Sequence, residues 1–182
     1  NARKTFKYFW RELSWEYRRI VPALDLAYVK IAFTQDGEDG QIVEHMWIND
    51  VQFDGNKIQG TLINSPNELT NVAEEDFVEV ALDQLSDWLF AITETKPKGK
   101  RSKSSAEAKP TTYGGFTIQA IRSEMSSEER NEHDEAWGLD FGDCNEILLV
   151  NDQKAKPENL IEHPMSKNMG KELMSYLKEN PD

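Results

Sequence analysis

The sequence predicts an α+β fold: a curled antiparallel sheet, shaped as a small barrel-like meander, covered by an N-terminal helix and two C-terminal helices. Three observations predict it. An amphipathic stretch opens the chain, short β-rich runs joined by tight turns follow, and helical patterns return in the last third. A length of 182 residues is ample for one hydrophobic core, so we expect residues 1–182 to form a single domain.

The first segment is expected to form an amphipathic helix that stops before Pro22, because proline cannot continue a helix and biases Val21 away from the helical region. Apolar residues at spacings of three and four share one face: Phe6, Phe9, Trp10, Leu13, Tyr17 and Ile20. Basic residues are assigned to the other side: Lys4, Lys7, Arg11 and Arg18. The aromatic face could dock a partner, but packing on the protein's own sheet is the simpler interpretation.

Strand patterns follow the helix. Ala27–Phe33 is β-rich and leads into a polar, glycine-containing turn at 35–40. In Gln41–Phe53, strict alternation assigns five residues to one face: Val43, His45, Trp47, Val51 and Phe53. The Asp54-Gly55-Asn56 stretch predicts a tight hairpin turn, with 57–63 returning as the partner strand.

The second half of the sheet is expected to continue by short connections. Asp76–Ala81 reads as a short strand with Phe77 and Val80 in the core. Asp83–Ile92 is either a short helical turn or a bent strand, and it supplies apolar residues to the core: Leu85, Trp88 and Leu89. Thr117–Ile121 is predicted to be a further strand.

Residues 95–112 contain no large apolar side chain, so we expect a flexible basic insertion between two strands. A regulatory or anion-binding loop is the alternative. Ser126 and Glu129 stand at capping-box spacing and predict a helix that runs to Trp137. Glu146–Val150 is expected to be a strand inside the sheet, and Met165–Leu177 a final helix.

The charge is uneven. The chain has 33 acidic and 21 basic residues, a net charge of −12. Residues 1–20 contain six basic and two acidic residues, and residues 96–109 contain six basic residues and one acidic residue. The remaining residues must therefore have a net charge of about −21. An acidic body repels phosphate backbones and attracts basic surfaces, which makes nucleic acid a poor partner and a basic protein a good one.

The composition excludes several classes. No run approaches the roughly 20 apolar residues of a membrane span, and no secretory signal pattern is present. A single cysteine, Cys144, excludes an internal disulfide framework and a redox pair. We therefore expect a cytoplasmic protein with no membrane association. The chain begins at Asn1 rather than Met, so we also expect residues upstream.

The candidate catalytic residues are His45, Glu44 and Asp87, with His45 as general base. A strand points Glu44 and His45 to opposite faces, so the two cannot act at one point. A half-buried, hydrogen-bonded histidine is the simpler interpretation of His45. Cys144 with His133 or His163 is a weaker alternative, because acidic neighbours oppose thiolate formation. Metal-ligand spacings are not found, so we expect no metal and no cofactor.

Several strings together resemble a known family. They are Glu44-His45-Met46-Trp47, Asp54-Gly55, Gly60-Thr61-Leu62-Ile63-Asn64-Ser65-Pro66, Ser86-Asp87-Trp88 and Tyr113-Gly114-Gly115-Phe116-Thr117. The chain resembles an uncharacterised bacterial family, domain of unknown function 2314. The resemblance implies no established activity and no catalytic residue. Loosely similar small bacterial domains are associated with immunity to secreted toxins, which is an analogy of context.

The leading functional hypothesis is a non-enzymatic protein-binding module, of the immunity or inhibitor type, that acts on a basic partner. Its acidic contacts would be Glu128, Glu129 and Glu132, with Trp137 as the apolar anchor. The alternative is a hydrolase-type enzyme with a histidine–carboxylate site around His45, supported by Glu44, Asp87 or Asp134. The oligomeric state has no indicator in the sequence.

Overall fold

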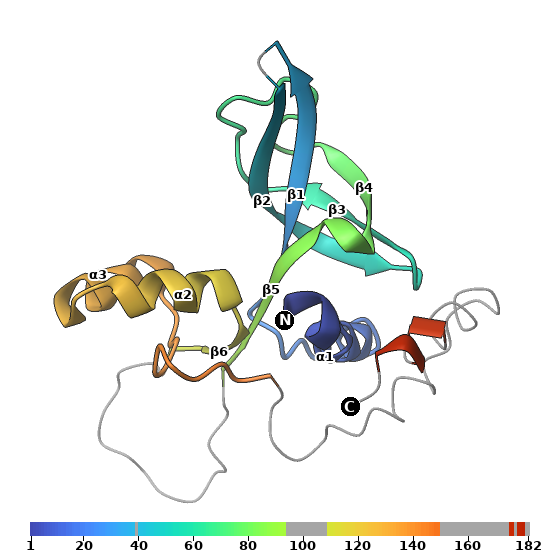
Figure 1. Cartoon of the computed structure of the whole chain (residues 1–182). Helices are drawn as coiled ribbons and strands as arrows, with labels where there is room; N and C mark the ends of the chain where they lie inside the picture. Colours follow the sequence, from blue (N-terminus) through green and yellow to red (C-terminus); the bar gives the residue numbers. More distant parts are fainter. Residues whose placement is uncertain (39, 94–108, 150–174, 177, 181–182) are drawn as a thin grey trace, which may run out of the picture.

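The computed structural model describes residues 1–38, 40–93, 109–149, 175–176 and 178–180 (Figure 1). The fold is α+β, as predicted. Its elements in chain order are α1 (Ala2–Glu16), β1 (Leu26–Gly37), β2 (Gly40–Phe53), β3 (Lys57–Leu62), β4 (Phe77–Ala81), the 3-10 turn η1 (Leu82–Gln84), β5 (Leu85–Ile92), β6 (Thr111–Gly114), α2 (Phe116–Glu124) and α3 (Ser127–Trp137).

The six strands form one curled antiparallel sheet in the order β4-β3-β2-β1-β5-β6. It is open, so the barrel-like closure is not reached. The first four strands are a meander, but β5 does not extend it beyond β4. After the η1 turn the chain crosses back and pairs β5 with the free edge of β1. Residues 94–108, most of the predicted basic insertion, lie outside the described residues.

Helix α1 covers one face of the sheet and ends earlier than predicted. The Glu16 carboxylate accepts the Ala23 N–H at 3.0 Å and the Arg19 side chain at 2.8 Å, so the chain reverses directly after the helix. Ile20 is consequently fully exposed, and its place on the apolar face was wrong. The solvated basic face was wrong as well: Arg11 is fully buried, ion-paired to the neighbouring Glu12 carboxylate at 2.9 Å.

Strand β2 does not keep one alternation throughout. Asp50 has a left-handed φ of 49°, and the pairing with β3 shifts register between Asn49 and Gln52. The β-bulge moves Val51 and Phe53 onto the α1 face, whereas His45 is exposed on the opposite face. Strict alternation therefore assigned these two apolar residues to the wrong face.

Three further predictions in the sheet were wrong. Phe77 is 64% exposed, whereas Val80 is buried as expected. Residues 117–121 belong to helix α2. Residues 146–149 form no strand, although the Leu148 carbonyl oxygen accepts the Gly114 N–H of β6 at 2.8 Å. The segment at 140 also lies beside β6, since Thr112 N–H donates to the Asp140 carbonyl oxygen at 3.0 Å. Helix α3 and its capping box at Ser126 are confirmed. Residues 165–174 and 177 lie outside the described part.

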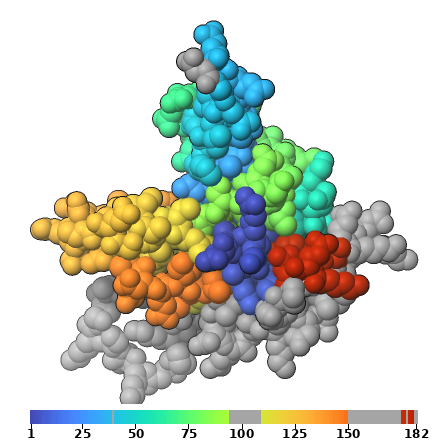
Figure 2. Space-filling view, in the orientation of Figure 1, coloured from blue at the N-terminus to red at the C-terminus, as the bar shows by residue number. Residues whose placement is uncertain are grey.

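Both faces of the central sheet are covered. The larger core lies between the sheet and α1 and holds Phe6, Phe9, Trp10, Phe53 and Trp88 among others. The smaller core lies on the other face, under α2, and consists of Trp47, Leu89, Ala91, Ile118, Leu139 and Phe141. In the space-filling view α2 and α3 project from the side of the body, and the β1–β2 hairpin projects from its top (Figure 2). Strand β5 runs between the two cores, and all its residues but Ser86 are buried.

Gly114 allows the close approach of β6 to Trp88. A Cβ at this position would lie 2.2 Å from the Trp88 carbonyl oxygen and 2.4 Å from the Trp88 ring, and its φ is +79°. We expect Gly114→Ala to lower the free energy of unfolding by about 3 kcal/mol or more, measured by urea denaturation. The matched control is Gly138→Ala, where φ is +66° but no atom lies within 4 Å. It should cost only about 1–2 kcal/mol of backbone strain. Equal losses in the two variants would contradict this account of Gly114.

Candidate functional site

Four of the five strings that carry the family resemblance meet in space around β5; Asp54-Gly55 lies in the β2–β3 turn. Ser86 contacts β2 at His45, and Asp87 contacts the start of α2 at Phe116 and Thr117. The turn after β3 joins the same region, since Trp47 N–H donates to the Asn64 side-chain oxygen at 2.9 Å. Residues far apart in the chain thus form one connected polar region at the edge of the smaller core.

Asp87 holds the beginning of α2. Its side chain is fully buried, and its carboxylate accepts the backbone N–H of Phe116 at 3.0 Å and of Thr117 at 2.6 Å. It also accepts the Thr117 hydroxyl at 2.7 Å and the Trp88 N–H at 2.8 Å. Gly115, the residue before the helix, has no side chain with which to cap it, so Asp87 supplies the cap from a neighbouring strand. These four hydrogen bonds occupy the carboxylate of Asp87, which the sequence analysis gave as a candidate catalytic residue.

Glu44 holds the loop that follows β3. Its carboxylate accepts the backbone N–H groups of Asn67, Glu68 and Leu69 at 2.5–2.9 Å. The hydrogen bonds from Asn67 and Glu68 stabilise the ionised form and hold the pKa of Glu44 below its ordinary value of 4.5. As the strand alternation predicts, Glu44 points away from His45, so the two do not act together.

His45 lies in a cavity and pairs with a serine. Its Nδ1 is 2.6 Å from Ser86 Oγ, and its side chain is exposed. Among the described residues no carboxylate lies within ion-pair distance of the His45 ring. Ser86 reaches it because of a β-bulge: Lys30 pairs with Asp87 and Ile31 with Leu85, which leaves Ser86 as the additional residue. The hydrolase hypothesis gains a cavity and a hydroxyl here but no supporting acid, and it stays a prediction.

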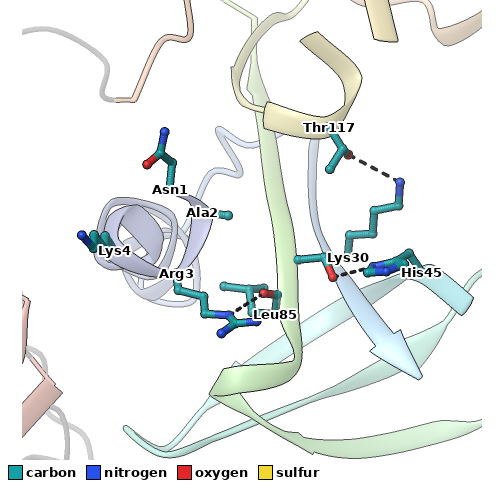
Figure 3. A pocket seen from close by; sticks show the side chains of 9 residues that line it. Asn1, Ala2, Arg3, Lys4, Lys30, His45, Leu85 and Thr117 are labelled. Carbon is teal, nitrogen blue, oxygen red and sulfur yellow. Dashed lines mark hydrogen bonds between the residues drawn. The ribbon is translucent and has the colours of Figure 1, made fainter. Parts of the chain in front are cut away.

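The cavity beside His45 is basic, a feature that the sequence analysis missed. It has a volume of about 680 Å³ and is lined by residues from α1, β1, β2, β5 and α2 (Figure 3). Arg3 and Lys30 reach it from opposite sides of β5, as the close-up shows. Lys30 sits in mid-strand between apolar neighbours, and a lone lysine in a strand is the one signal that could have drawn attention to it.

Helix α3 carries the predicted binding residues on a solvated surface. None of its residues is buried, and Glu128, Glu129 and Glu132 are all exposed. Glu129 also closes the capping box, since its carboxylate accepts the Ser126 N–H at 2.7 Å and thereby lowers the pKa of Glu129. Trp137 is 37% exposed and packs edge-on against Phe141, with ring centroids 6.0 Å apart.

The other titratable candidates have structural partners. Asp134 forms a two-point ion pair with the Arg122 guanidinium, at 2.9 and 2.7 Å, and lies 3.0 Å from His133 Nδ1. Cys144 Sγ accepts a hydrogen bond from Arg130 at 3.0 Å. In the part of the chain that the structure describes, no group of three or more His, Cys, Asp or Glu side chains could hold a metal ion. His163 lies outside the described residues.

The fold and these connected strings define an open antiparallel sheet with one helix on one face and a helical hairpin on the other. The chain belongs to the bacterial family described as "Uncharacterized protein conserved in bacteria (DUF2314)", whose family model matches residues 1–141. The predicted resemblance is thereby confirmed. No solved structure matches the chain. Within the described residues, no helix is long and apolar enough to cross a membrane.

Two relatives are similar in sequence. A protein of Neisseria meningitidis serogroup B, which carries the name "Putative ankyrin repeat protein", is 54% identical over 181 residues. The match covers 100% of this chain and 65% of that protein, so the chain spans less than two thirds of the relative. Uncharacterized protein YegJ of Escherichia coli K12 is 26% identical over 108 residues, 59% of this chain and 58% of that protein.

Replacement of Asp87 should destabilise the fold even though its shape is retained. In Asp87→Asn one carboxylate oxygen is replaced by an NH2 group, which cannot accept hydrogen bonds from the N–H groups of α2. We therefore expect a loss of about 2–4 kcal/mol in the free energy of unfolding. Chemical denaturation measures it, with Asp83→Asn, an exposed carboxylate on η1, as the matched control. A loss no larger than that of the control would refute the capping role.

Glu44 should make stability depend on acid pH. Because its pKa is lowered in the folded chain, its stabilising effect is complete above pH 4.5 and is lost as the pH falls through the folded pKa. The free energy of unfolding of the wild type should therefore exceed that of Glu44→Gln at neutral pH, and this difference should shrink as the pH falls below 4.5 through the lowered pKa of Glu44. Glu124→Gln, at an exposed carboxylate, should show no such convergence. A constant difference across the pH range would contradict the assignment.

Proposed function

We propose that this chain is a protein-binding module that recognises a basic partner through α3, in the manner of an immunity protein or inhibitor. The observation that supports it most is the exposure of α3. A helix of eleven residues without a single buried side chain contributes little to the protein's own core, and its sequence is nevertheless fully capped at both ends.

The charge of this region favours a cationic partner. Between 116 and 149 there are nine carboxylates against two arginines. One of the arginines, Arg122, is buried and neutralised by Asp134, so the exposed surface is more acidic than the count alone indicates. A concentrated field of one sign accelerates association with an oppositely charged protein and weakens as salt is added.

Trp137 supplies an apolar contact beside these carboxylates. Its ring is already held by Phe141 and lies 6.1 Å from the His133 ring, so little freedom remains to be lost on binding. Exposed, pre-positioned tryptophans are typical anchors of protein interfaces. The described fold differs from the stacked helix pairs of ankyrin repeats, so the name of the Neisseria relative lends the proposal no structural support. We assign the interaction to the cytoplasm on the sequence prediction.

The test is capture from source-cell lysate at low and high salt, followed by association kinetics with the purified partner. The variant is Glu128→Lys with Glu132→Lys, which reverses two exposed charges and spares the capping residue Glu129. We expect the association rate to fall about tenfold or more at low salt and the difference to shrink at high salt. Trp137→Ala should instead raise the dissociation rate.

The matched control reverses two exposed charges elsewhere, Asp36→Lys with Glu38→Lys, in the β1–β2 hairpin that projects away from α3 (Figure 2). The net charge changes equally in both double variants, so only a local contact separates them. A partner that binds both double variants alike, or that is insensitive to salt, would exclude α3 as the binding surface.

A further inference from the structure

The cavity beside His45 is lined by cations in a chain that is acidic overall. Its charged and polar side chains come from Asn1 before α1, Arg3 and Lys4 on α1, Lys30 on β1, His45 on β2, Ser86 on β5 and Thr117 on α2. None of its lining residues is acidic, although acidic residues outnumber basic ones by 33 to 21 in the chain. Cations that gather on such a surface without carboxylates repel one another unless an anion joins them.

These cations are held in place but not neutralised. Arg3 donates Nε–H to the Leu85 carbonyl oxygen at 3.0 Å, which orients the guanidinium; its two terminal nitrogens have no hydrogen-bond partner within the described parts of the chain. Lys30 Nζ lies 5.4 Å from the centre of the Trp47 ring and donates to Thr117 Oγ1 over 3.4 Å. Among the described residues, no carboxylate forms an ion pair with Arg3, Lys4 or Lys30.

The nearest buried acid is already satisfied. Asp87 pairs with Lys30 across the sheet by backbone register, but its carboxylate accepts three hydrogen bonds from the start of α2 and one from the Trp88 N–H, and it forms no ion pair with the lysine. Thr117 stands between them: its hydroxyl donates to Asp87 and accepts from Lys30. The positive charge of Lys30 therefore remains available to the cavity.

We propose that this cavity binds the phosphate group of a small phosphorylated molecule. A phosphate monoester carries close to two negative charges and three terminal acceptor oxygens, which suits several cations and the Ser86 hydroxyl better than a single carboxylate does. The terminal nitrogens of Arg3 offer a two-point donor, and Lys30 offers a point charge opposite them. A volume of about 680 Å³ exceeds a phosphate and leaves room for an organic remainder.

The site is independent of the α3 surface. Its lining residues lie around β5 and the first turn of α1, and none belongs to α3. It also gives the hydrogen bond between His45 and Ser86 a role without catalysis, because the pair fixes one wall of the cavity. Failure of either proposal therefore leaves the other untouched.

The experiment is calorimetric titration of residues 1–182 with phenyl phosphate, inorganic phosphate and benzoate at constant ionic strength, up to about 20 mM of each. We expect saturable one-to-one binding of phenyl phosphate and binding of benzoate at least about tenfold weaker. If inorganic phosphate binds with the same affinity as phenyl phosphate, the proposed site is supported and its ligand is free phosphate. If inorganic phosphate binds with lower affinity than phenyl phosphate, the site is supported and its ligand is an organic phosphate.

Two variants from opposite walls locate the site. Arg3→Gln and Lys30→Gln should each weaken phenyl phosphate binding by about tenfold or more. Arg18→Gln is the matched control, because Arg18 is exposed beyond the other end of α1 and its replacement removes the same charge. Because Lys30 is half-buried, the unfolding midpoint of each variant is measured without ligand to check that it folds. Arg3 is exposed, so if Lys30→Gln does not fold, the binding of phenyl phosphate to Arg3→Gln tests the site.

Two results would overturn the proposal. One is the absence of phosphate binding to the wild type over this concentration range. The other is equal weakening in Arg3→Gln and Arg18→Gln, which would reduce the effect to the overall charge of the protein. Retention of binding in the Glu128→Lys, Glu132→Lys variant is expected and separates the cavity from α3.

Discussion

Three consecutive residues of β5 connect the main parts of the described fold, because each one contacts a different neighbour. Trp88 is fully buried under α1, where its Nε1–H donates to the Ala2 carbonyl oxygen at 3.1 Å. Asp87 points to the opposite face and caps α2. Ser86, turned by the β-bulge, contacts His45 on β2. A strand can do this only when both of its faces are covered, which the return of β5 beside β1 achieves.

Hydrogen bonding explains why the carboxylates beside the candidate histidine are structural. Glu44 accepts three backbone N–H groups and Asp87 accepts three, besides the Thr117 hydroxyl. A buried or loop N–H group without a partner is costly, and a carboxylate is the strongest acceptor that a chain can offer it. The same residue types therefore serve as caps and loop anchors, and composition alone cannot separate these roles from acid–base chemistry.

Charge is separated over the surface of the molecule. The helical hairpin α2–α3 and the segment after it carry nine carboxylates around Trp137, whereas Arg3, Lys4 and Lys30 line the cavity around β5. Since screening limits surface fields to about 8–10 Å at physiological ionic strength, an acidic surface and a cationic cavity can coexist on one small protein. The net charge of −12 describes neither of them.

What the sequence by itself determined is local. The periodicity of Phe6, Phe9, Trp10 and Leu13 fixed α1, the Asp54-Gly55-Asn56 turn fixed the β2–β3 hairpin, and the Ser126–Glu129 spacing fixed the start of α3, because each depends on residues within a few positions. The class of fold followed from these elements.

Only the tertiary structure decided the rest. Residues 117–121 became helical because Asp87, thirty positions earlier, caps them, and Val51 and Phe53 changed faces at the bulge of Asp50. The cavity combines α1, three strands and α2, so no stretch of sequence contains it. Backbone pairing and long-range hydrogen bonds bring these residues together, and they act between segments whose separation along the chain carries no local pattern.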